Sequence, residues 1–161
     1  MPPMNDNVLF LDEHQGAPGG QAVAEWQCAN LLARFFHYLD EQRHDDITAF
    51  FTAEGRWHRQ GRLLVGGYAI RAALQVRTHD CFVRHVLSAP CVTVGRDQRV
   101  TVQAAVTVYA APWDAQHSLP LIAAGPQLVL NTTASMVPAR RGYEIAELID
   151  TPVFRFAGAL H

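Results

Sequence analysis

The first half of the chain follows a helical hydrophobic pattern. From Gln21 to about Arg43, apolar residues recur at spacings of three and four, which is typical of one buried helix face. The residues of this face are Val23, Trp26, Leu31, Leu32, Phe35, Phe36 and Leu39. A second, short helix is predicted from about Asp45 to Phe51, ended by Gly55, and a third from Gly67 to Val76.

Beyond Thr78 the pattern changes to strands, because β-branched and aromatic residues alternate with polar ones between turn-forming residues. One strand is predicted before the third helix, Arg56–Gln60, and four after it: Cys81–Val94, Arg99–Ala110, Gln127–Val137 and Tyr143–Ile149. The links 95–98 and 138–142 suit hairpins, and 111–126 is expected to be a projecting loop. This order predicts an α+β fold, with helices on one face of a strongly curved, mostly antiparallel sheet.

The length of 161 residues fits one domain. Residues 1–20 mix proline, glycine and polar residues and predict a flexible N-terminal arm, so residues 21–161 are expected to form a single domain. Hydrophobic residues make up 49% and charged residues 17% of the chain, which favours a compact globular fold over a disordered one. A domain of this size buries enough surface to enclose a pocket.

Charge and cysteine usage narrow the function classes. The formal net charge is −2, which gives no electrostatic case for nucleic-acid binding. The chain has arginine but no lysine, which excludes Schiff-base lysine chemistry and a Walker-type phosphate loop. Three cysteines without a C-x-x-C pair, no signal segment and no membrane-length apolar run lead us to expect a cytoplasmic protein without a membrane partner.

The strand after Thr78 places one histidine among apolar neighbours. His85 shares a strand face with Val83 and Leu87, so its imidazole is expected to be partly desolvated and able to accept a proton near neutral pH. Asp40 closes the first helix at the edge of its apolar face, where its carboxylate is in a position to orient such a histidine. The alternatives are a structural histidine bonded to the backbone and a solvated carboxylate in an acidic corner.

Other polar residues are candidates for substrate binding. In the first strand, Trp57 faces opposite to His58, and His58 lies either at an exposed edge or in a wet cavity. Asn131 shares a face with Val129 and offers hydrogen bonds to a ligand, and Tyr38 is a further pocket candidate. Core or rim packing is the alternative for each of them.

Metal and cysteine chemistry find little support in the sequence. His79, Cys81 and His85 share a strand face, but His85 lies too far along an extended chain from Cys81 for one tetrahedral site. None of the cysteines lies in an activating motif, and glycine pairs such as Gly66–Gly67 lack phosphate-loop spacing. We therefore expect neither a metal nor a cofactor.

Several segments together resemble a known family. These are 35–40 (FFHYLD), 45–51 (DDITAFF), 55–61 (GRWHRQG), 67–71 (GYAIR), 84–86 (RHV) and 142–147 (GYEIAE). In this order, over roughly residues 21 to 156, the chain resembles the SnoaL-like branch of the nuclear-transport-factor-two-like superfamily. The resemblance implies a cone: a curved sheet wrapped around a long N-terminal helix and enclosing an apolar pocket.

Scytalone dehydratase and bile acid dehydratase are the functional look-alikes within that superfamily. In these enzymes a pocket histidine paired with an aspartate moves protons during loss of water, and the resemblance assigns these roles to His85 and Asp40. The family's tyrosine just before the aspartate is Leu39 here, and its second catalytic histidine on the next strand has no counterpart.

The resemblance implies a small cofactor-independent lyase (dehydratase) or isomerase acting on a cyclic, largely apolar molecule. His85 and Asp40 would be catalytic, and Tyr38, Trp57, His58 and Asn131 would bind substrate. The alternative is a non-catalytic ligand-binding or accessory subunit like the β subunits of ring-hydroxylating dioxygenases. In either case a homodimer or homotrimer formed through the outer sheet face is expected.

Overall fold

The computed structural model describes residues 18–76, 81–113 and 119–157. The predicted arm lies mostly outside these residues, and the first helix begins at Pro18. The helical elements are α1 (Pro18–Asp40), α2 (His44–Ile47), the 3-10 turn η1 (Thr48–Phe50) and α3 (Gly66–Gln75). The strands are β1 (Phe51–Arg59), β2 (Arg62–Val65), β3 (Cys81–Leu87), β4 (Cys91–Val94), β5 (Val100–Pro112), β6 (Pro126–Ala139) and β7 (Gly142–Arg155).

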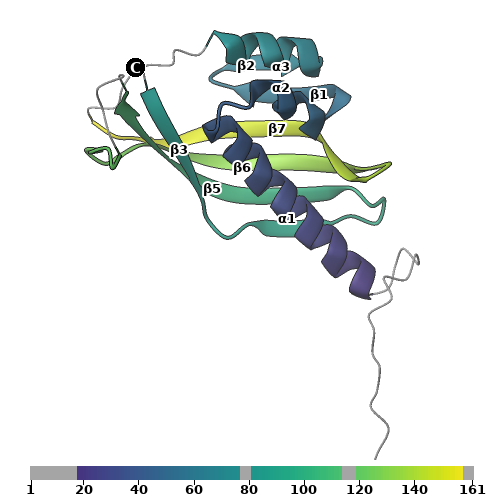
Figure 1. Cartoon of the computed structure of the whole chain (residues 1–161). Helices are drawn as coiled ribbons and strands as arrows, with labels where there is room; N and C mark the ends of the chain where they lie inside the picture. Colours follow the sequence, from purple (N-terminus) through teal and green to yellow (C-terminus); the bar gives the residue numbers. More distant parts are fainter. Residues whose placement is uncertain (1–17, 77–80, 114–118, 158–161) are drawn as a thin grey trace, which may run out of the picture.

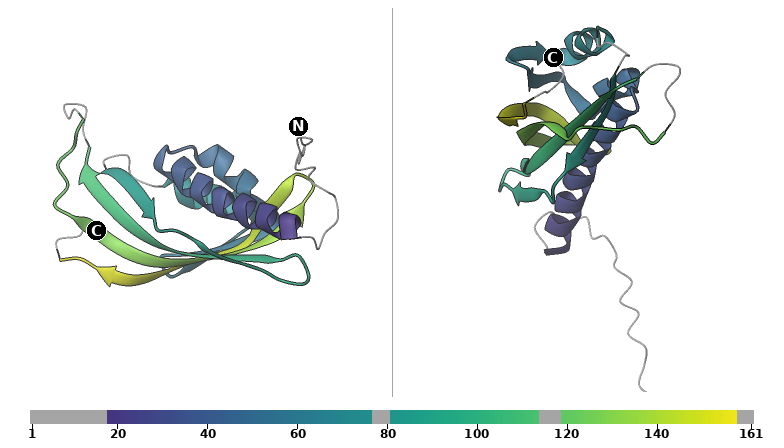
Figure 2. Two further views of the ribbon diagram at one scale, coloured as in Figure 1. Left: turned by 90° about the horizontal axis from the view of Figure 1, so that it is seen from below. Right: turned by 90° about the vertical axis from the view of Figure 1, so that its left-hand side faces the viewer.

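The strands form one curved sheet of seven strands with α1 lying along its concave face (Figures 1 and 2). The order is β2-β1-β7-β6-β5-β3, and β4 pairs with β5 beyond the end of β3. Every pair is antiparallel except β1 with β7, which is parallel, so the sheet is mixed rather than purely antiparallel. The predicted α+β architecture is confirmed.

The amphipathic pattern of α1 supplies the centre of the core. The buried side chains of this helix are Ala24, Cys28, Leu32, Phe35, Phe36 and Leu39. Phe35 makes edge-to-face contacts with Phe50, Phe51 and Trp57 at ring-centroid distances of 6.3, 5.8 and 5.3 Å. Each such aromatic burial contributes about 1.5–3 kcal/mol. Trp26 was predicted to join this face but is exposed, because it lies half a turn away from Ala24 and Cys28.

The second helical segment is shorter than predicted. α2 and η1 end at Phe50, and β1 begins at Phe51, five residues earlier than the predicted strand. Gly55, predicted to end the helix, lies instead inside β1, where the pairing with β7 shifts register between Phe51 and Arg56. A Cβ at Gly55 would lie 2.7 Å from the Cβ of Phe51, so the close turn of the backbone requires glycine.

The predicted strand 81–94 is two strands in the structure. β3 ends at Leu87, and β4 begins after Pro90, which lacks the N–H that a continuing strand would need. Ser88 closes the gap, because its backbone N–H donates to the Ala105 carbonyl at 2.9 Å and its hydroxyl accepts the Ala105 N–H at 3.0 Å. Pairing with β5 is thereby preserved on both sides of the break.

Both predicted hairpins are confirmed. In the β4–β5 turn the Gly95 N–H donates to the Arg99 carbonyl at 2.7 Å, and β6 returns as β7 through a two-residue link whose next residue, Gly142, has φ of 86°. The structure also adds β2, which was not predicted, and extends β7 to Arg155, six residues past the predicted end. None of the described helices is long and apolar enough to cross a membrane.

Candidate active site

The structure brings His85 and Asp40 into direct contact. β3 places His85 opposite Val108 of β5, on the concave side of the sheet, and Asp40 is the last residue of α1. The Nδ1 atom of His85 lies 2.5 Å from Oδ1 of Asp40, and the backbone N–H of His85 donates to Oδ2 at 2.9 Å. The carboxylate therefore holds one residue at two points, which fixes the ring orientation and places the imidazole proton on Nδ1.

The pair is shielded but not sealed from solvent. The side chains of His85 and Asp40 are 10% and 6% exposed. The ring of Phe36, one helical turn before Asp40, lies 5.1 Å from the His85 ring and covers one side of it. Within the described part of the chain the Nε2 atom of His85 has no hydrogen-bond partner, so this nitrogen is the one able to exchange a proton with a bound molecule.

A second carboxylate, Asp150 of β7, faces the same interior. Its Oδ2 accepts a hydrogen bond from Nε1 of Trp57 at 2.8 Å, and its Oδ1 accepts one from the hydroxyl of buried Thr132 at 2.7 Å. Burial raises the pKa of Asp150, while these two hydrogen bonds and the charges of His85 and Arg59 oppose the rise.

Asp150 was not among the predicted site residues, because the predicted strand ended at Ile149. Aspartate and proline are depleted in strands, and Asp150 and Pro152 follow closely there. The strand nevertheless continues, and Thr132 pairs opposite Asp150 in the register of β6 and β7. The usable signal was alternation: Asp150 lies two residues after buried Leu148 and therefore on the same face.

Trp57 supports Asp150 from within the core. It is buried between Phe35 and Phe51, and its one polar atom is occupied by the Asp150 carboxylate. The structure therefore places Trp57, predicted to bind substrate, in the core behind the Asp150 carboxylate.

Tyr38 lies away from the His85–Asp40 pair. It is two residues before Asp40 on α1, so its side chain leaves the helix about 200° around the axis from that of Asp40. It packs edge-to-face on Phe50 at 5.1 Å, and the Arg43 guanidinium carbon lies 3.9 Å from the centre of its ring.

His58 and Asn131 also lie elsewhere, on the outer face of the sheet. His58 faces opposite to buried Trp57, and its Nε2 lies 2.8 Å from Oε1 of Glu147. On β6 the buried positions are Leu130, Thr132, Ala134 and Met136, whereas Asn131 is exposed between its partners Ala105 and Thr151. Asn131 was predicted to line the pocket, and this was wrong. Alternation correctly groups it with Val129, but packing against α1 buries the opposite face of β6, because both faces mix polar and apolar residues.

Metal-ligating and nucleophilic groups form no second centre among the described residues. No group of three or more histidine, cysteine or acidic side chains there is arranged to hold a metal ion, and His79 lies outside the described ranges. Burial raises the pKa of the Cys28 thiol to about 12, which keeps it protonated and unreactive. Cys81 is half-buried and Cys91 exposed, and neither forms a disulfide.

Comparison with known proteins agrees with this architecture. A family model for the SnoaL-like domain matches residues 21–129, more than half of the chain. The chain therefore belongs to the SnoaL-like domain family, which confirms the family predicted from the sequence. A search of curated proteins finds no significant match.

Solved structures share the fold at low sequence identity. An NTF2-like protein with a cystatin-like fold from Novosphingobium aromaticivorans is 18% identical, with a TM-score of 0.70 over 87% of this chain and 88% of that one. A protein of the same organism, provisionally assigned as a scytalone dehydratase, is 11% identical, with a TM-score of 0.68 over 88% and 90%. A protein from Catenulispora acidiphila, solved in complex with S-DNPA, is 20% identical, with a TM-score of 0.63 over 83% and 94%.

Proposed function

We propose that this protein is a cofactor-independent lyase or isomerase in which His85 and Asp40 move protons on a cyclic, largely apolar small molecule. The observation that carries the proposal is the two-point hold of Asp40 on His85, which leaves Nε2 as the free nitrogen. Two of the similar structures support a reaction on a small molecule by their own descriptions, one as a provisional scytalone dehydratase and one as a complex with S-DNPA.

The His85 tautomer that carries its proton on Nδ1 leaves Nε2 to act as the base. Nε2 of His85 removes a proton from a carbon next to a carbonyl group, and the C–H electron pair moves toward the carbonyl oxygen as an enolate forms. The Asp40 carboxylate stabilises the imidazolium that results. In dehydration the electron pair returns to expel a β-hydroxyl group, which takes the proton from Nε2 and leaves as water. In isomerisation the proton returns to a different carbon, and in both cases His85 ends in its starting state.

Asp150 supplies a second polar group for such a substrate. Trp57 and Thr132 occupy one lone pair on each of its oxygens, which fixes the carboxyl while leaving further acceptor capacity. Because burial raises its pKa, this carboxyl holds a proton at higher pH than an exposed aspartate does and can then donate a hydrogen bond to a substrate oxygen.

The test is hydrogen exchange on a panel of cyclic hydroxyketones in deuterated water, followed by NMR. Exchange at the carbon next to the carbonyl reports proton removal whether the full reaction is dehydration or isomerisation. We expect His85→Ala to lose about two to four orders of magnitude in exchange rate. His58→Ala removes the histidine of the outer face and is the matched control. Equal exchange in wild type and His85→Ala, or no exchange on any substrate, would contradict the proposal.

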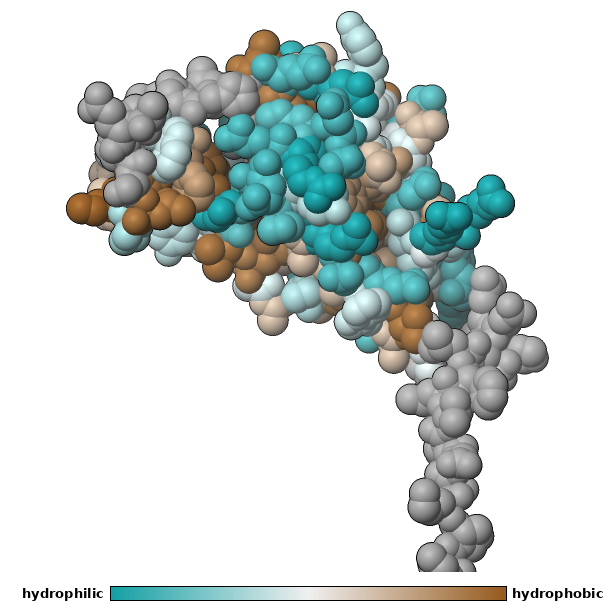
Figure 3. Space-filling view, viewed as in Figure 1, coloured by the Kyte–Doolittle hydropathy of each residue, from teal (hydrophilic) through white to brown (hydrophobic). Residues whose placement is uncertain are grey.

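A non-catalytic accessory subunit is the second candidate. Apolar side chains are exposed at the sheet end near His85, among them Val86, Tyr109 and Phe154, and hydrophobic residues gather at that end of the space-filling view (Figure 3). Such a surface fits a partner protein. The test is purification of this protein from its native host. Co-purification with one other chain at constant stoichiometry, in a complex that His85→Ala leaves intact, would favour an accessory subunit over an enzyme.

A further inference from the structure

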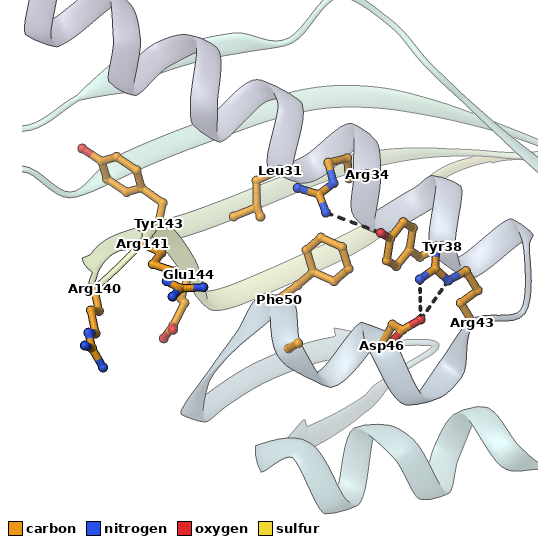
Figure 4. A pocket seen from close by; sticks show the side chains of 11 residues that line it. Leu31, Arg34, Tyr38, Arg43, Asp46, Phe50, Arg140, Arg141, Tyr143 and Glu144 are labelled. Carbon is orange, nitrogen blue, oxygen red and sulfur yellow. Dashed lines mark hydrogen bonds and ion pairs between the residues drawn. The ribbon is translucent and has the colours of Figure 1, made fainter. Parts of the chain in front are cut away.

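We propose that the cavity between α1, η1 and the β6–β7 turn is a second binding site, for a small organic anion that joins an apolar ring to one carboxylate. This proposal does not depend on the proposed function at His85. The cavity has a volume of about 460 Å³, which is within the range of small-molecule sites. Figure 4 shows it bounded by α1 on one side and by the turn with Arg140 and Arg141 on the other.

One wall of this cavity is apolar. Leu31 from α1 and Phe50 from η1 lie between the two ends of the cavity in Figure 4. Phe50 is fixed by its edge-to-face contacts with Phe35 and Tyr38 at 6.3 and 5.1 Å. This wall offers a ring-sized hydrophobic contact that an inorganic anion would not use.

The rim of the cavity carries more positive than negative charge. Arg43 is neutralised by Asp46, because its guanidinium lies 2.7 Å from that carboxylate. Arg34 contacts uncharged groups there: it donates to the Tyr38 hydroxyl at 3.4 Å, and its guanidinium carbon lies 5.7 Å from the ring centres of Tyr38 and Phe50. Among the described side chains, Arg140 and Arg141 have no recorded ion-pair or hydrogen-bond partner.

The lining therefore contains three arginines without a recorded ion pair and one further carboxylate, Glu144, in a chain whose overall charge is −2. The Tyr38 hydroxyl responds to the same positive field. Its pKa is lowered by the hydrogen bond from Arg34 and by the charges of Arg43 and Arg34, although partial desolvation opposes the change. Guanidinium groups bind carboxylates through paired N–H donors, so a carboxylate is the head group that this rim favours.

The cavity is separate from the His85–Asp40 pair. Leu31, Arg34 and Tyr38 occupy one side of α1, whereas Phe36 and Asp40 occupy the side that faces His85. One helix therefore forms a wall of both sites, and a ligand in this cavity would not contact His85.

The test is calorimetric titration of the purified protein with 1-naphthoate at low ionic strength. The neutral 1-naphthamide tests the carboxylate, and inorganic phosphate tests the apolar ring. The Arg140→Ala/Arg141→Ala variant removes two of the three guanidinium groups that have no recorded ion pair. The control is Arg62→Ala, which removes an exposed guanidinium group on β2, away from the cavity.

We expect 1-naphthoate to bind at least tenfold more tightly than 1-naphthamide or phosphate. We expect the double variant to weaken binding about tenfold, and Arg62→Ala and His85→Ala to leave the affinity within twofold. The proposal is overturned if 1-naphthoate does not bind at millimolar concentration, if the amide or phosphate binds equally well, or if the double variant binds as wild type does. Loss of binding in His85→Ala alone would place the ligand at the other site and also overturn it.

Discussion

The two faces of the sheet each carry a histidine paired with a carboxylate. On the concave face, His85 meets Asp40 with side chains 10% and 6% exposed. On the outer face, His58 meets Glu147 at a similar distance, but the side chains are 40% and 25% exposed, and Arg56 shares the same carboxylate oxygen at 3.2 Å. The chemical groups are nearly the same, and their surroundings differ.

The difference shows that contact alone does not make a candidate site. Water screens the outer pair, and Arg56 offers its carboxylate another partner, so little free energy depends on it. The Asp40 carboxylate is shielded from water and also accepts a hydrogen bond from the backbone N–H of His85. Loss of its two hydrogen bonds would therefore destabilise the fold. Burial therefore distinguishes the His85–Asp40 pair from an ordinary surface ion pair such as His58–Glu147.

The largest effect on stability is expected at the inner pair. Asp40→Ala would leave two buried N–H groups of His85 without their acceptor, and we expect the free energy of unfolding to fall by about 3 kcal/mol. Urea denaturation followed by circular dichroism measures this change. A loss below about 1 kcal/mol would mean that the inner pair is no more important to the fold than the outer one.

A pH-dependent effect is expected at Asp150. Because its pKa is raised in the folded state, the fold binds this proton more tightly than the unfolded chain does. This contribution to stability is fully present below the unfolded pKa of about 3.9 and is lost as pH rises through the folded pKa, at about 1.4 kcal/mol per unit of pKa difference. Asp150→Asn removes this titration.

Urea unfolding of wild type and Asp150→Asn at a series of pH values from 4 upward measures this effect. The free energy of unfolding of wild type minus that of the variant should decrease as pH rises. A difference that stays constant or grows would show that the pKa of Asp150 is not raised in the fold.

The smallest effect is expected at the outer pair. Glu147→Ala removes the partner of both Arg56 and His58, yet it should change the free energy of unfolding by less than about 1 kcal/mol. The change should shrink further at high salt, because exposed charges are screened. Unfolding in low and high salt checks both points, and a loss equal to that of Asp40→Ala would remove the contrast between the two faces.

Local patterns predicted much of the fold and the central pair. The helical spacing of Leu32, Phe35, Phe36 and Leu39 predicts the buried face of α1, because side chains three and four apart share a helix face. Alternation places His85 with Val83 and Leu87, and these three are less exposed than Arg84 and Val86. The contact between Asp40 and His85 was expected from these positions together with the family resemblance.

Local patterns failed where tertiary contacts override them. β1 begins early because Phe51 pairs with Ile145 across the sheet, and β7 continues through Asp150 and Pro152 because β6 pairs with it along its whole length. Alternation gave two possible faces for Asn131, and only packing against α1 chose between them.

The sequence by itself determined the α+β order, the helix that packs on the concave face of the sheet and the apolar strand face that carries His85, because each rests on side-chain periodicity within one element. The tertiary structure decided that Trp57 holds Asp150 93 positions away along the chain, that Tyr38 joins an arginine-rimmed cavity and that His58 faces outward. These outcomes depend on strand register and sheet curvature, which arise from pairing between distant segments and are not encoded in any single stretch of residues.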